Sequence, residues 1–209
     1  MVEGVRKERA ATTRAALIRA ARDLFARQGY HSTGTHDVVA AAQVTRGALY
    51  HHFHDKAALF EAVFLEVEED LVGQSTMAVE GLAGDPWKQL QQGLAVFLQL
   101  IAGQPEMQRI LLLDGPVVLG WPRWREVEAS FTLGHIQRSL AVSMENGVLP
   151  AQPVGPMAHL ISAALNEAAL LIAHSEDPEA TGVEVSAALT RLVGGLVGDT
   201  PTMIRTPGG

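Results

Sequence analysis

The 209-residue sequence contains no cysteine, which excludes disulfide bonds and thiol catalysis and suits a reducing compartment. Its first sixteen residues are polar and lack the apolar core of a signal peptide. No apolar run is expected to reach membrane-spanning length, because the nearest one, residues 157–173, is interrupted by His159, Asn166 and Glu167. These absences predict a soluble, cytoplasmic protein without membrane contact.

Catalytic motifs are also missing. The sequence has no phosphate-binding glycine loop and no nucleophile motif, and no pair among the acidic residues 66–70 or the histidines has catalytic spacing. Five of the eight histidines lie between His31 and His54, but His51, His52 and His54 stand at a helix end, where their spacing does not place three imidazoles on one face. We therefore expect no enzyme activity, no metal site and no cofactor.

Charge is distributed unevenly along the chain. The formal net charge is −7, but residues 1–56 carry nine Lys or Arg against five Asp or Glu, a net charge of +4. Residues 57–209 carry the other seven bases and eighteen acids, a net charge of −11. With 47% hydrophobic residues the composition is that of a globular protein, and its charge asymmetry suggests a basic, nucleic-acid-binding end on an acidic body.

Apolar residues recur at helical spacing through most of the chain, and no strand pattern is longer than a few residues. Between residues 13 and 28 an apolar stripe recurs at i, i+4, i+7 and i+8, and Gly29 is expected to end this helix. Further helices are predicted over residues 35–42, 46–52, 56–73, 86–102, 105–113, 123–146, 156–174 and 181–197, with caps at Thr45, Asp55 and Asp85 and a loop or broken helix over 114–122. The predicted fold class is all-α.

Residues 38–56 have the layout of a helix-turn-helix, the motif that places one helix in the major groove of DNA. Six apolar residues are spaced to form its small core: Val38, Val39, Ala42, Val44, Leu49 and Phe53. In the third helix Arg46 has the side chain that pairs with guanine, Gly47 permits a close approach, and the helix N-terminus at Thr45 favours a phosphate. The candidates for further contacts with phosphates or base edges are Tyr50, His51, His52 and Lys56.

A longer pattern surrounds this motif. Its residues are Leu24, Phe25, Gly29, Tyr30, Thr33, Asp37, Val38, Ala42, Val44, Thr45, Gly47, Leu49, Tyr50, His52, Phe53, Lys56 and Leu59. At these spacings, residues 14–64 resemble the N-terminal domain of the TetR family of transcriptional repressors. The resemblance implies a three-helix DNA-binding domain followed by a C-terminal helical domain for ligand binding and dimerisation.

The resemblance also implies a set of DNA contacts: Thr35 and His36 of the second helix, with Thr45, Arg46, Gly47, Tyr50, His51, His52 and Lys56. A basic N-terminal arm, carrying Arg6, Lys7, Arg9 and Arg14, would add backbone or minor-groove contacts. Two positions depart from the family pattern. Gln43 replaces the usual turn glycine, where φ is positive, at a cost of about 1 kcal/mol. His36 replaces a longer polar or basic residue, which leaves base readout there open.

The last two predicted helices are apolar around most of their circumference and must be buried on more than one side. We favour a homodimer through these helices, and burial within one chain is the alternative. The family resemblance implies a small-molecule effector among the central helices. Its candidate lining is Trp87, Phe97, Ile110, Trp121, Trp124, Phe131 and His135, for which membership of the plain core is the alternative.

These patterns predict a DNA-binding domain with a basic arm over residues 1–56, a helical ligand-binding and dimerisation domain over 57–198, and a flexible tail over 199–209. The expected function is that of a ligand-responsive repressor, released from a palindromic DNA operator by a small apolar or aromatic effector. The alternatives are a dimeric helical carrier of small molecules without sequence-specific DNA binding, and an enzyme on a helical scaffold.

Overall fold

The computed structural model describes residues 2–80 and 84–197, and within these ranges it contains helices and no strands, which confirms the all-α prediction. The first helix, α1 (Val2–Ser32), begins eleven residues before its predicted start. The predicted basic arm is therefore a helical extension of α1, since the Glu, Arg, Lys and Ala residues that dominate it are good helix formers. At Gly29 the backbone leaves the helical region (φ 79°, ψ 167°), so the expected break occurs there, followed by one more helical turn.

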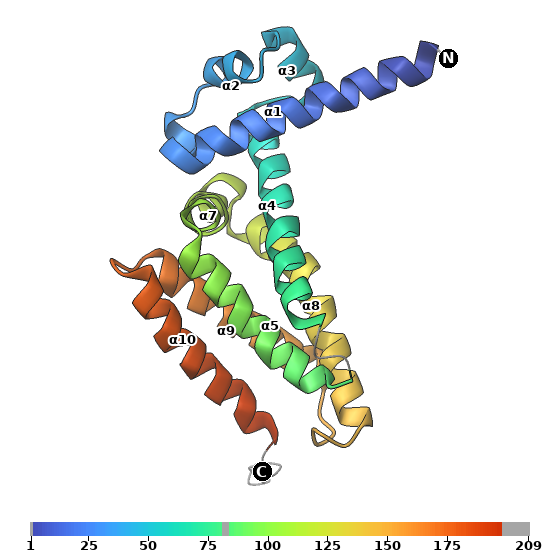
Figure 1. Cartoon of the computed structure of the whole chain (residues 1–209), viewed down its shortest axis with the longest axis vertical. Helices are drawn as coiled ribbons and strands as arrows, with labels where there is room; N and C mark the ends of the chain where they lie inside the picture. The colour runs from blue at the N-terminus through green and yellow to red at the C-terminus, as the bar shows by residue number, and fades with distance from the viewer. Residues whose placement is uncertain (1, 81–83, 198–209) are drawn as a thin grey trace, which may run out of the picture.

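Two short helices follow, α2 (Thr35–Ala41) and α3 (Arg46–His52). Gly34 is the N-cap of α2, and its N–H donates to the Asp37 carboxylate at 3.1 Å. Thr45 is the N-cap of α3, as predicted, and its hydroxyl accepts from the Ala48 N–H at 3.2 Å. All six residues predicted for the small core are buried or packed against buried residues. Together with the first turns of α4 these helices form the head of the molecule (Figure 1).

The turn between α2 and α3 carries the expected backbone irregularity. Gln43 has a φ of 55°, and it is the one non-glycine residue with a positive φ in the part of the chain that the structure describes. Its N–H donates to the Ala40 carbonyl at 3.2 Å, and the following N–H, of Val44, donates to Val39 at 3.1 Å. These two bonds hold a left-handed conformation that disfavours any side chain with a Cβ.

Helix α4 (Lys56–Val79) connects the head to the body, and Asp55 caps it as predicted by accepting from the Ala58 N–H at 2.7 Å. The body consists mainly of α5 (Pro86–Gly103), α8 (Trp121–Glu145), α9 (Val154–Ala173) and α10 (Pro178–Gly194), which ends in the 3-10 turn Gly195–Val197. In Figure 1 these helices lie below the head, with α4 descending among them. The domain boundary at residue 56 coincides with the start of α4 and stays a prediction, and the predicted tail lies outside the described residues.

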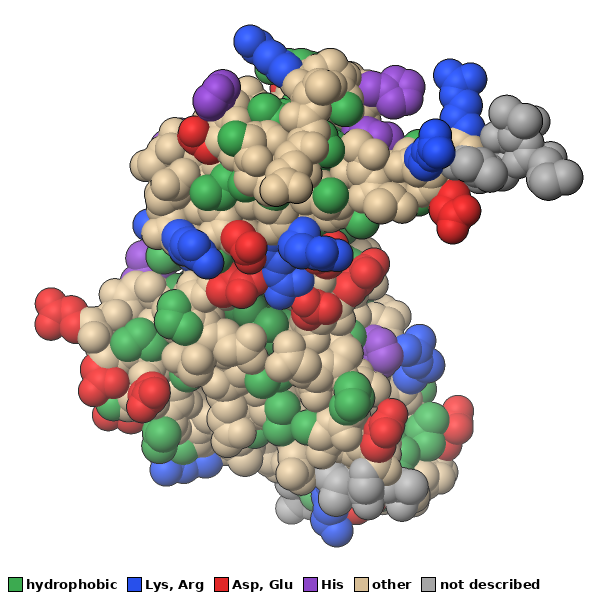
Figure 2. Space-filling model, turned by 45° about the horizontal axis from the view of Figure 1, so that its top comes forward, with side chains coloured by type: hydrophobic (Ala, Val, Ile, Leu, Met, Phe, Trp, Pro, Cys, Tyr) green, Lys and Arg blue, Asp and Glu red, His purple; other side chains and the backbone are tan. Residues whose placement is uncertain are grey.

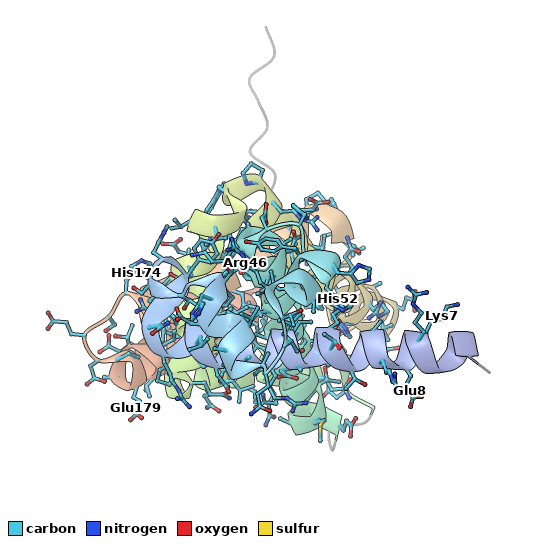
Figure 3. All side chains as sticks on the ribbon, turned by 90° about the horizontal axis from the view of Figure 1, so that it is seen from above. Lys7, Glu8, Arg46, His52, His174 and Glu179 are labelled. Atoms are coloured by element: carbon cyan, nitrogen blue, oxygen red, sulfur yellow. The ribbon has the colours of Figure 1, made fainter. Side chains whose placement is uncertain are left out.

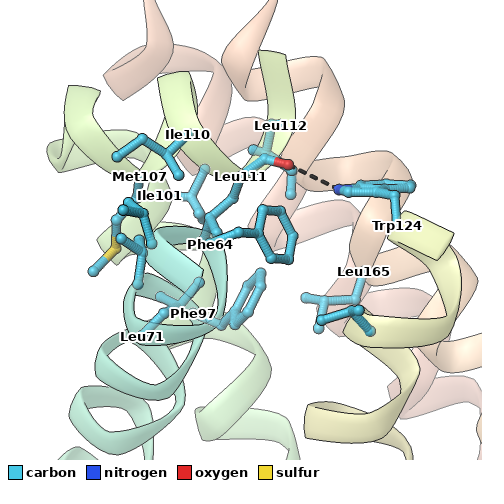
Figure 4. Close-up of a cluster of buried hydrophobic side chains, with 14 of the residues drawn as sticks. Phe64, Leu71, Phe97, Ile101, Met107, Ile110, Leu111, Leu112, Trp124 and Leu165 are labelled. Atoms are coloured by element: carbon cyan, nitrogen blue, oxygen red, sulfur yellow. Dashed lines mark hydrogen bonds between the residues drawn. The ribbon is translucent and has the colours of Figure 1, made fainter. Parts of the chain in front are cut away.

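The segment between α5 and α8 is an interrupted helix, as expected from its glycines and prolines. It consists of α6 (Pro105–Met107), the π-helix Gln108–Asp114 and α7 (Gly115–Leu119), and it breaks at Gly120 (φ 76°). A Cβ on Gly115 would lie 2.7 Å from Phe64, so only glycine permits this close approach to α4. The buried cluster around this segment includes Phe64, Ile110 and Trp124 (Figure 4).

Two helices correct the expectation about apolar runs. Val154–Ala173 and Pro178–Val197 are long and apolar enough to cross a membrane by length and composition. Core helices of soluble proteins also meet this criterion, and α9 packs against α5, α8 and α10. The sequence-based expectation failed because the polar residues that interrupt the run are too few to lower its average hydropathy.

Candidate nucleic-acid interface and ligand cavity

Three of the predicted DNA contacts form one cluster on the outer face of the head. The Cζ atom of Arg46 lies 5.5 Å from the centroid of the Tyr50 ring. Arg46, and then Thr35, lower the pKa of the Tyr50 phenol by hydrogen bonding. Helices α2 and α3 thus present one joint surface, and Figure 3 shows Arg46 and His52 on it from above.

Four other predicted contacts of α2 and α3 are open to solvent. The side chain of His36 is 94% exposed, and its Nδ1 lies 3.8 Å from the Asp37 carboxylate. Thr45, Gly47 and His51 are exposed as well, although the Thr45 hydroxyl already serves as the cap of α3. A DNA backbone can therefore reach these groups without a rearrangement of the head.

His52 differs from its neighbours because it is partly covered. Burial lowers the pKa of its imidazole, and the nearby His51 and Arg14 act in the same direction. Arg14 lies with its Cζ atom 5.3 Å from the centroid of the Phe53 ring, so α1 brings a guanidinium to the end of α3. The remaining residues of the predicted arm, Arg6, Lys7 and Arg9, are exposed along α1, and Figure 3 shows Lys7 far along that helix.

Lys56 is engaged inside the head. Its ammonium donates to the carbonyl oxygens of Tyr30 at 2.8 Å and Thr33 at 3.0 Å, and it lies 4.0 Å from the centroid of the Tyr30 ring. The side chain ties the start of α4 to the end of α1. Its contact with DNA stays a prediction, and its internal role was not visible in the sequence.

The body contains a cavity of about 250 Å³ between α4, α5, α8 and α9. Three of the seven predicted lining residues contribute to it: Phe97, Phe131 and His135. The surrounding wall is mostly apolar, with Leu94 of α5 and Leu165 of α9 among its members. A pocket of this size and character suits a small, largely apolar ligand.

The other four predicted lining residues lie elsewhere. Trp124 is fully buried beside the π-helix, and its indole N–H donates to the Leu111 carbonyl at 2.8 Å (Figure 4). Ile110 and Trp87 are core residues away from the cavity wall. Trp121 is 56% exposed, because Gly120 turns the chain just before it. Helical spacing alone does not distinguish a cavity wall from the core.

A buried polar cluster was missed by the sequence reasoning. Glu68 and Glu128 are 3% and 5% exposed, and the Asn166 side chain donates to Glu128 at 2.5 Å. Burial alone raises the pKa of Glu68 to about 8. Burial, and then the charge of Glu68, raise the pKa of Glu128 to about 9, while Arg125 acts in the opposite direction. The available signal was the place of Glu68 on the apolar stripe of α4.

Charged side chains fasten the head to the body. Arg22 of α1 forms ion pairs with Glu106 of α6 and with Asp70 of α4 (2.5 Å), and Glu66 lies at 3.3 Å. Burial lowers the pKa of Arg22, but the hydrogen bonds to Glu106 and Asp70 outweigh it and raise that pKa. Figure 2 shows basic and acidic side chains side by side at this junction.

Comparisons with known proteins agree with this architecture. Residues 17–63 match the family described as "Bacterial regulatory proteins, tetR family", and residues 87–196 match "Tetracyclin repressor-like, C-terminal domain". Over 107 residues the chain is 40% identical to the probable acrEF/envCD operon repressor of Escherichia coli (strain K12), a match that covers 50% of this chain and 48% of the relative. The chain thus spans about half the length of the curated relatives it matches.

Solved structures extend the likeness to the whole fold. A TetR-family transcriptional regulator from Pectobacterium atrosepticum is 34% identical with a TM-score of 0.79, and the match covers 90% of this chain and 96% of that one. RolR in complex with its ligand resorcinol is 21% identical with a TM-score of 0.69, covers 90% of both chains, and is similar in fold. With its helix-turn-helix head and its matched C-terminal domain, this chain belongs to the TetR family of bacterial transcriptional regulators, a family of regulators rather than enzymes.

Proposed function

We propose that this protein is a homodimeric repressor that binds a palindromic DNA operator and leaves it when a small apolar or aromatic effector occupies the cavity in its body. The observation that carries the proposal is the cluster of Thr35, Arg46 and Tyr50 on the outer face of α2 and α3. Guanidinium and phenol groups at these positions suit base edges and phosphates in a major groove. As a bacterial transcription regulator, the protein is expected to act in the cytoplasm.

Helix α4 supplies the connection between ligand and DNA. Its C-terminal half lines the cavity with Val72 and Ser75, and its first residue, Lys56, binds the end of α1. A ligand that shifts α4 therefore changes the position of the head. In a dimer such a shift alters the spacing of the two heads, so that a ligand favouring the shifted conformer lowers the affinity for DNA.

Dimerisation is proposed through α9 and α10. Leu160 and Leu171 of α9 and Val183 and Leu192 of α10 are each more than half exposed. Apolar side chains of this size on two adjacent helices are typical of a subunit interface, and pairing the two helices with a second copy forms a four-helix contact. A two-fold axis there places one head on each half-site of a palindrome. Leu192→Glu should give a monomer in sedimentation velocity.

Selection of bound DNA from a random duplex pool tests the proposal. Enrichment of a palindrome with half-sites about one helical turn apart, or somewhat more, supports a dimeric operator-binding protein. The absence of any enriched sequence would favour the carrier without sequence-specific DNA binding. Parallel selections with two variants separate base readout from dimerisation. Arg46→Ala should enrich no sequence, whereas Leu192→Glu should enrich single half-sites rather than a palindrome.

The role of the cavity needs a separate test. Gly93 lines the cavity, and no atom lies within 4 Å of a Cβ built on it, so Gly93→Leu fills the cavity from the α5 side. Gly73→Leu is a matched control, because Gly73 is an exposed helical glycine with equally open surroundings outside the cavity. An effector found by screening for release from the selected operator should act on the Gly73 variant and fail on the Gly93 variant.

A further inference from the structure

The polar cluster of Glu68, Glu128 and Asn166 adjoins the cavity. Glu68 precedes Val72 by one helical turn on α4, Glu128 precedes Thr132 by one turn on α8, and Asn166 follows Leu165 on α9. Val72, Thr132 and Leu165 all line the cavity. Residues four apart share a helix face, so Glu68 and Glu128 lie one helical turn beyond the cavity wall on α4 and α8.

The side chains that line the cavity disfavour an anionic ligand. Among the described residues that line the cavity there is no Lys or Arg, and His135 is the one basic side chain. Glu80 lines the cavity as well, and the carboxyls of Glu68 and Glu128 lie one turn further along. A carboxylate or phosphate ligand would find no fixed positive charge on this wall.

Neither buried carboxyl forms an ion pair within the described residues, although the charge of Arg125 acts on Glu128. Burial raises the pKa of Glu68, and no other described residue offsets this effect. Glu128 has one neutral donor, Asn166, and the charged groups that act on it are Glu68 and Arg125. With pKa values of about 8 and about 9, both carboxyls hold a proton at neutral pH. A ligand cation can take the place of such a proton.

We propose that the effector of this cavity is an organic cation, whose ammonium group is held between Glu68 and Glu128 while its apolar or aromatic body lies against Phe97 and Phe131. The inference rests on the proposed function, because it names the ligand class of the same cavity. When the cation binds, one carboxyl releases its proton to solvent, and the charge within the site stays balanced. Asn166 orients the Glu128 carboxyl and is a positioning residue.

A matched pair of probes tests the charge requirement. Phenyltrimethylammonium and tert-butylbenzene have the same shape and differ in a positive nitrogen against a neutral carbon. Calorimetric titration of the full chain should show the cation binding at least about tenfold more tightly. Its affinity should rise by about tenfold from pH 6 to pH 7, and buffers of different ionisation enthalpy should report about one proton released per ligand.

Variants locate the effect. The double variant Glu68→Gln, Glu128→Gln should bind both probes with similar affinity and release no proton, and its unchanged binding of tert-butylbenzene shows that the cavity is intact. Glu69→Gln is the matched control, because Glu69 is an exposed glutamate on α4 next to Glu68, and this variant should keep the preference. Equal binding of both probes by the natural protein, or a preference that survives in the double variant, would overturn the inference.

The outcomes separate this inference from the proposed function. If the cation binds with proton release but leaves the selected operator bound, the ligand class stands and ligand-controlled repression fails. If the neutral probe releases the operator, the cation does not, and Gly93→Leu abolishes that release, the cavity is the effector site and the inference of a cation is wrong.

Discussion

Lys56 and Tyr30 form a two-sided contact within the head. The Lys56 ammonium donates to the Tyr30 carbonyl oxygen at 2.8 Å and lies 4.0 Å from the centroid of the same residue's ring. The carbonyl belongs to the turn that follows the break at Gly29, where helical hydrogen bonding is interrupted. The Tyr30 carbonyl also accepts the Thr33 N–H at 3.3 Å, so one charged side chain supplements the backbone bonding at the end of α1 and positions the start of α4.

Replacing this side chain should weaken the fold as well as DNA binding. We expect Lys56→Met to lower the free energy of unfolding by about 1.5 to 3 kcal/mol, the range for hydrogen bonds to a charged group. Urea denaturation followed by circular dichroism measures the change. Arg46→Met is the control, because Arg46 is exposed and should affect DNA binding without changing stability. Equal stability of the two variants would leave Lys56 as a DNA contact only.

The turn at Gln43 offers a gain in stability. With φ at 55°, Gln43 carries a steric cost of about 1 kcal/mol that glycine lacks, partly offset by the greater freedom of glycine in the unfolded chain. Gln43→Gly should therefore raise the free energy of unfolding by roughly 0.5 to 1 kcal/mol. The neighbouring Ala42 has a φ of −75°, so Ala42→Gly should lower it by a similar amount. The same sign of change for both variants would contradict the argument.

Base readout should depend on the cluster around Tyr50. Arg46→Ala and Tyr50→Ala should each weaken binding to the selected operator by about 1 to 3 kcal/mol while unrelated DNA is bound as before. Fluorescence anisotropy at several salt concentrations measures both affinities, which should fall steeply with salt because phosphates are neutralised. Arg138→Ala, on an exposed part of α8, serves as control. Undiminished operator affinity in both variants would refute the assignment of the site.

Asp114 should control the stability of the joint between head and body. Its carboxylate accepts the Tyr30 N–H at 2.8 Å, a charge-assisted bond between the π-helix and the end of α1. In Asp114→Ala the Tyr30 amide should exchange with deuterium at least about tenfold faster, which corresponds to the loss of about 1.5 kcal/mol or more. Asp114→Asn keeps an acceptor oxygen, so its Tyr30 amide should exchange at a rate between those of the natural protein and the alanine variant. An unchanged exchange rate of the Tyr30 amide in the alanine variant would show that this hydrogen bond does not stabilise the contact between head and body.

Stability should decrease with rising pH because of the buried acids. Glu68 and Glu128 have pKa values of about 8 and 9 in the fold, against ordinary values of 4.5. The folded state therefore retains protons that the unfolded chain releases, and this contribution is fully present below about pH 4.5 and is lost as pH rises toward 8 and 9. Each acid contributes a slope of up to about 1.4 kcal/mol per pH unit within that window. Between pH 5 and 9 the free energy of unfolding should fall less steeply for Glu68→Gln than for the natural protein. If the two proteins lose stability in parallel, Glu68 ionises normally in the fold.

Features that depend on neighbours along the chain were predictable. The caps Thr45 and Asp55 and the strained turn at Gln43 follow from short-range hydrogen bonding and backbone sterics, which act within four or five residues. The core of the head was likewise predictable, because apolar residues at helical spacing within so short a motif can pack together in few ways. Helix α1 begins eleven residues before its predicted start, because good helix formers extend a helix even where no apolar stripe marks it.

Contacts between distant segments were decided by the tertiary structure. Helical spacing made Trp124 and Phe131 equal candidates for the cavity, but packing against the π-helix buries the first and leaves the second on the wall. Glu68 and Glu128 are sixty residues apart in sequence, and only the crossing of α4 and α8 makes them a pair with shared electrostatics. Local sequence determines which face of a helix is apolar, whereas the partner that the face meets depends on how all the helices fill the same volume.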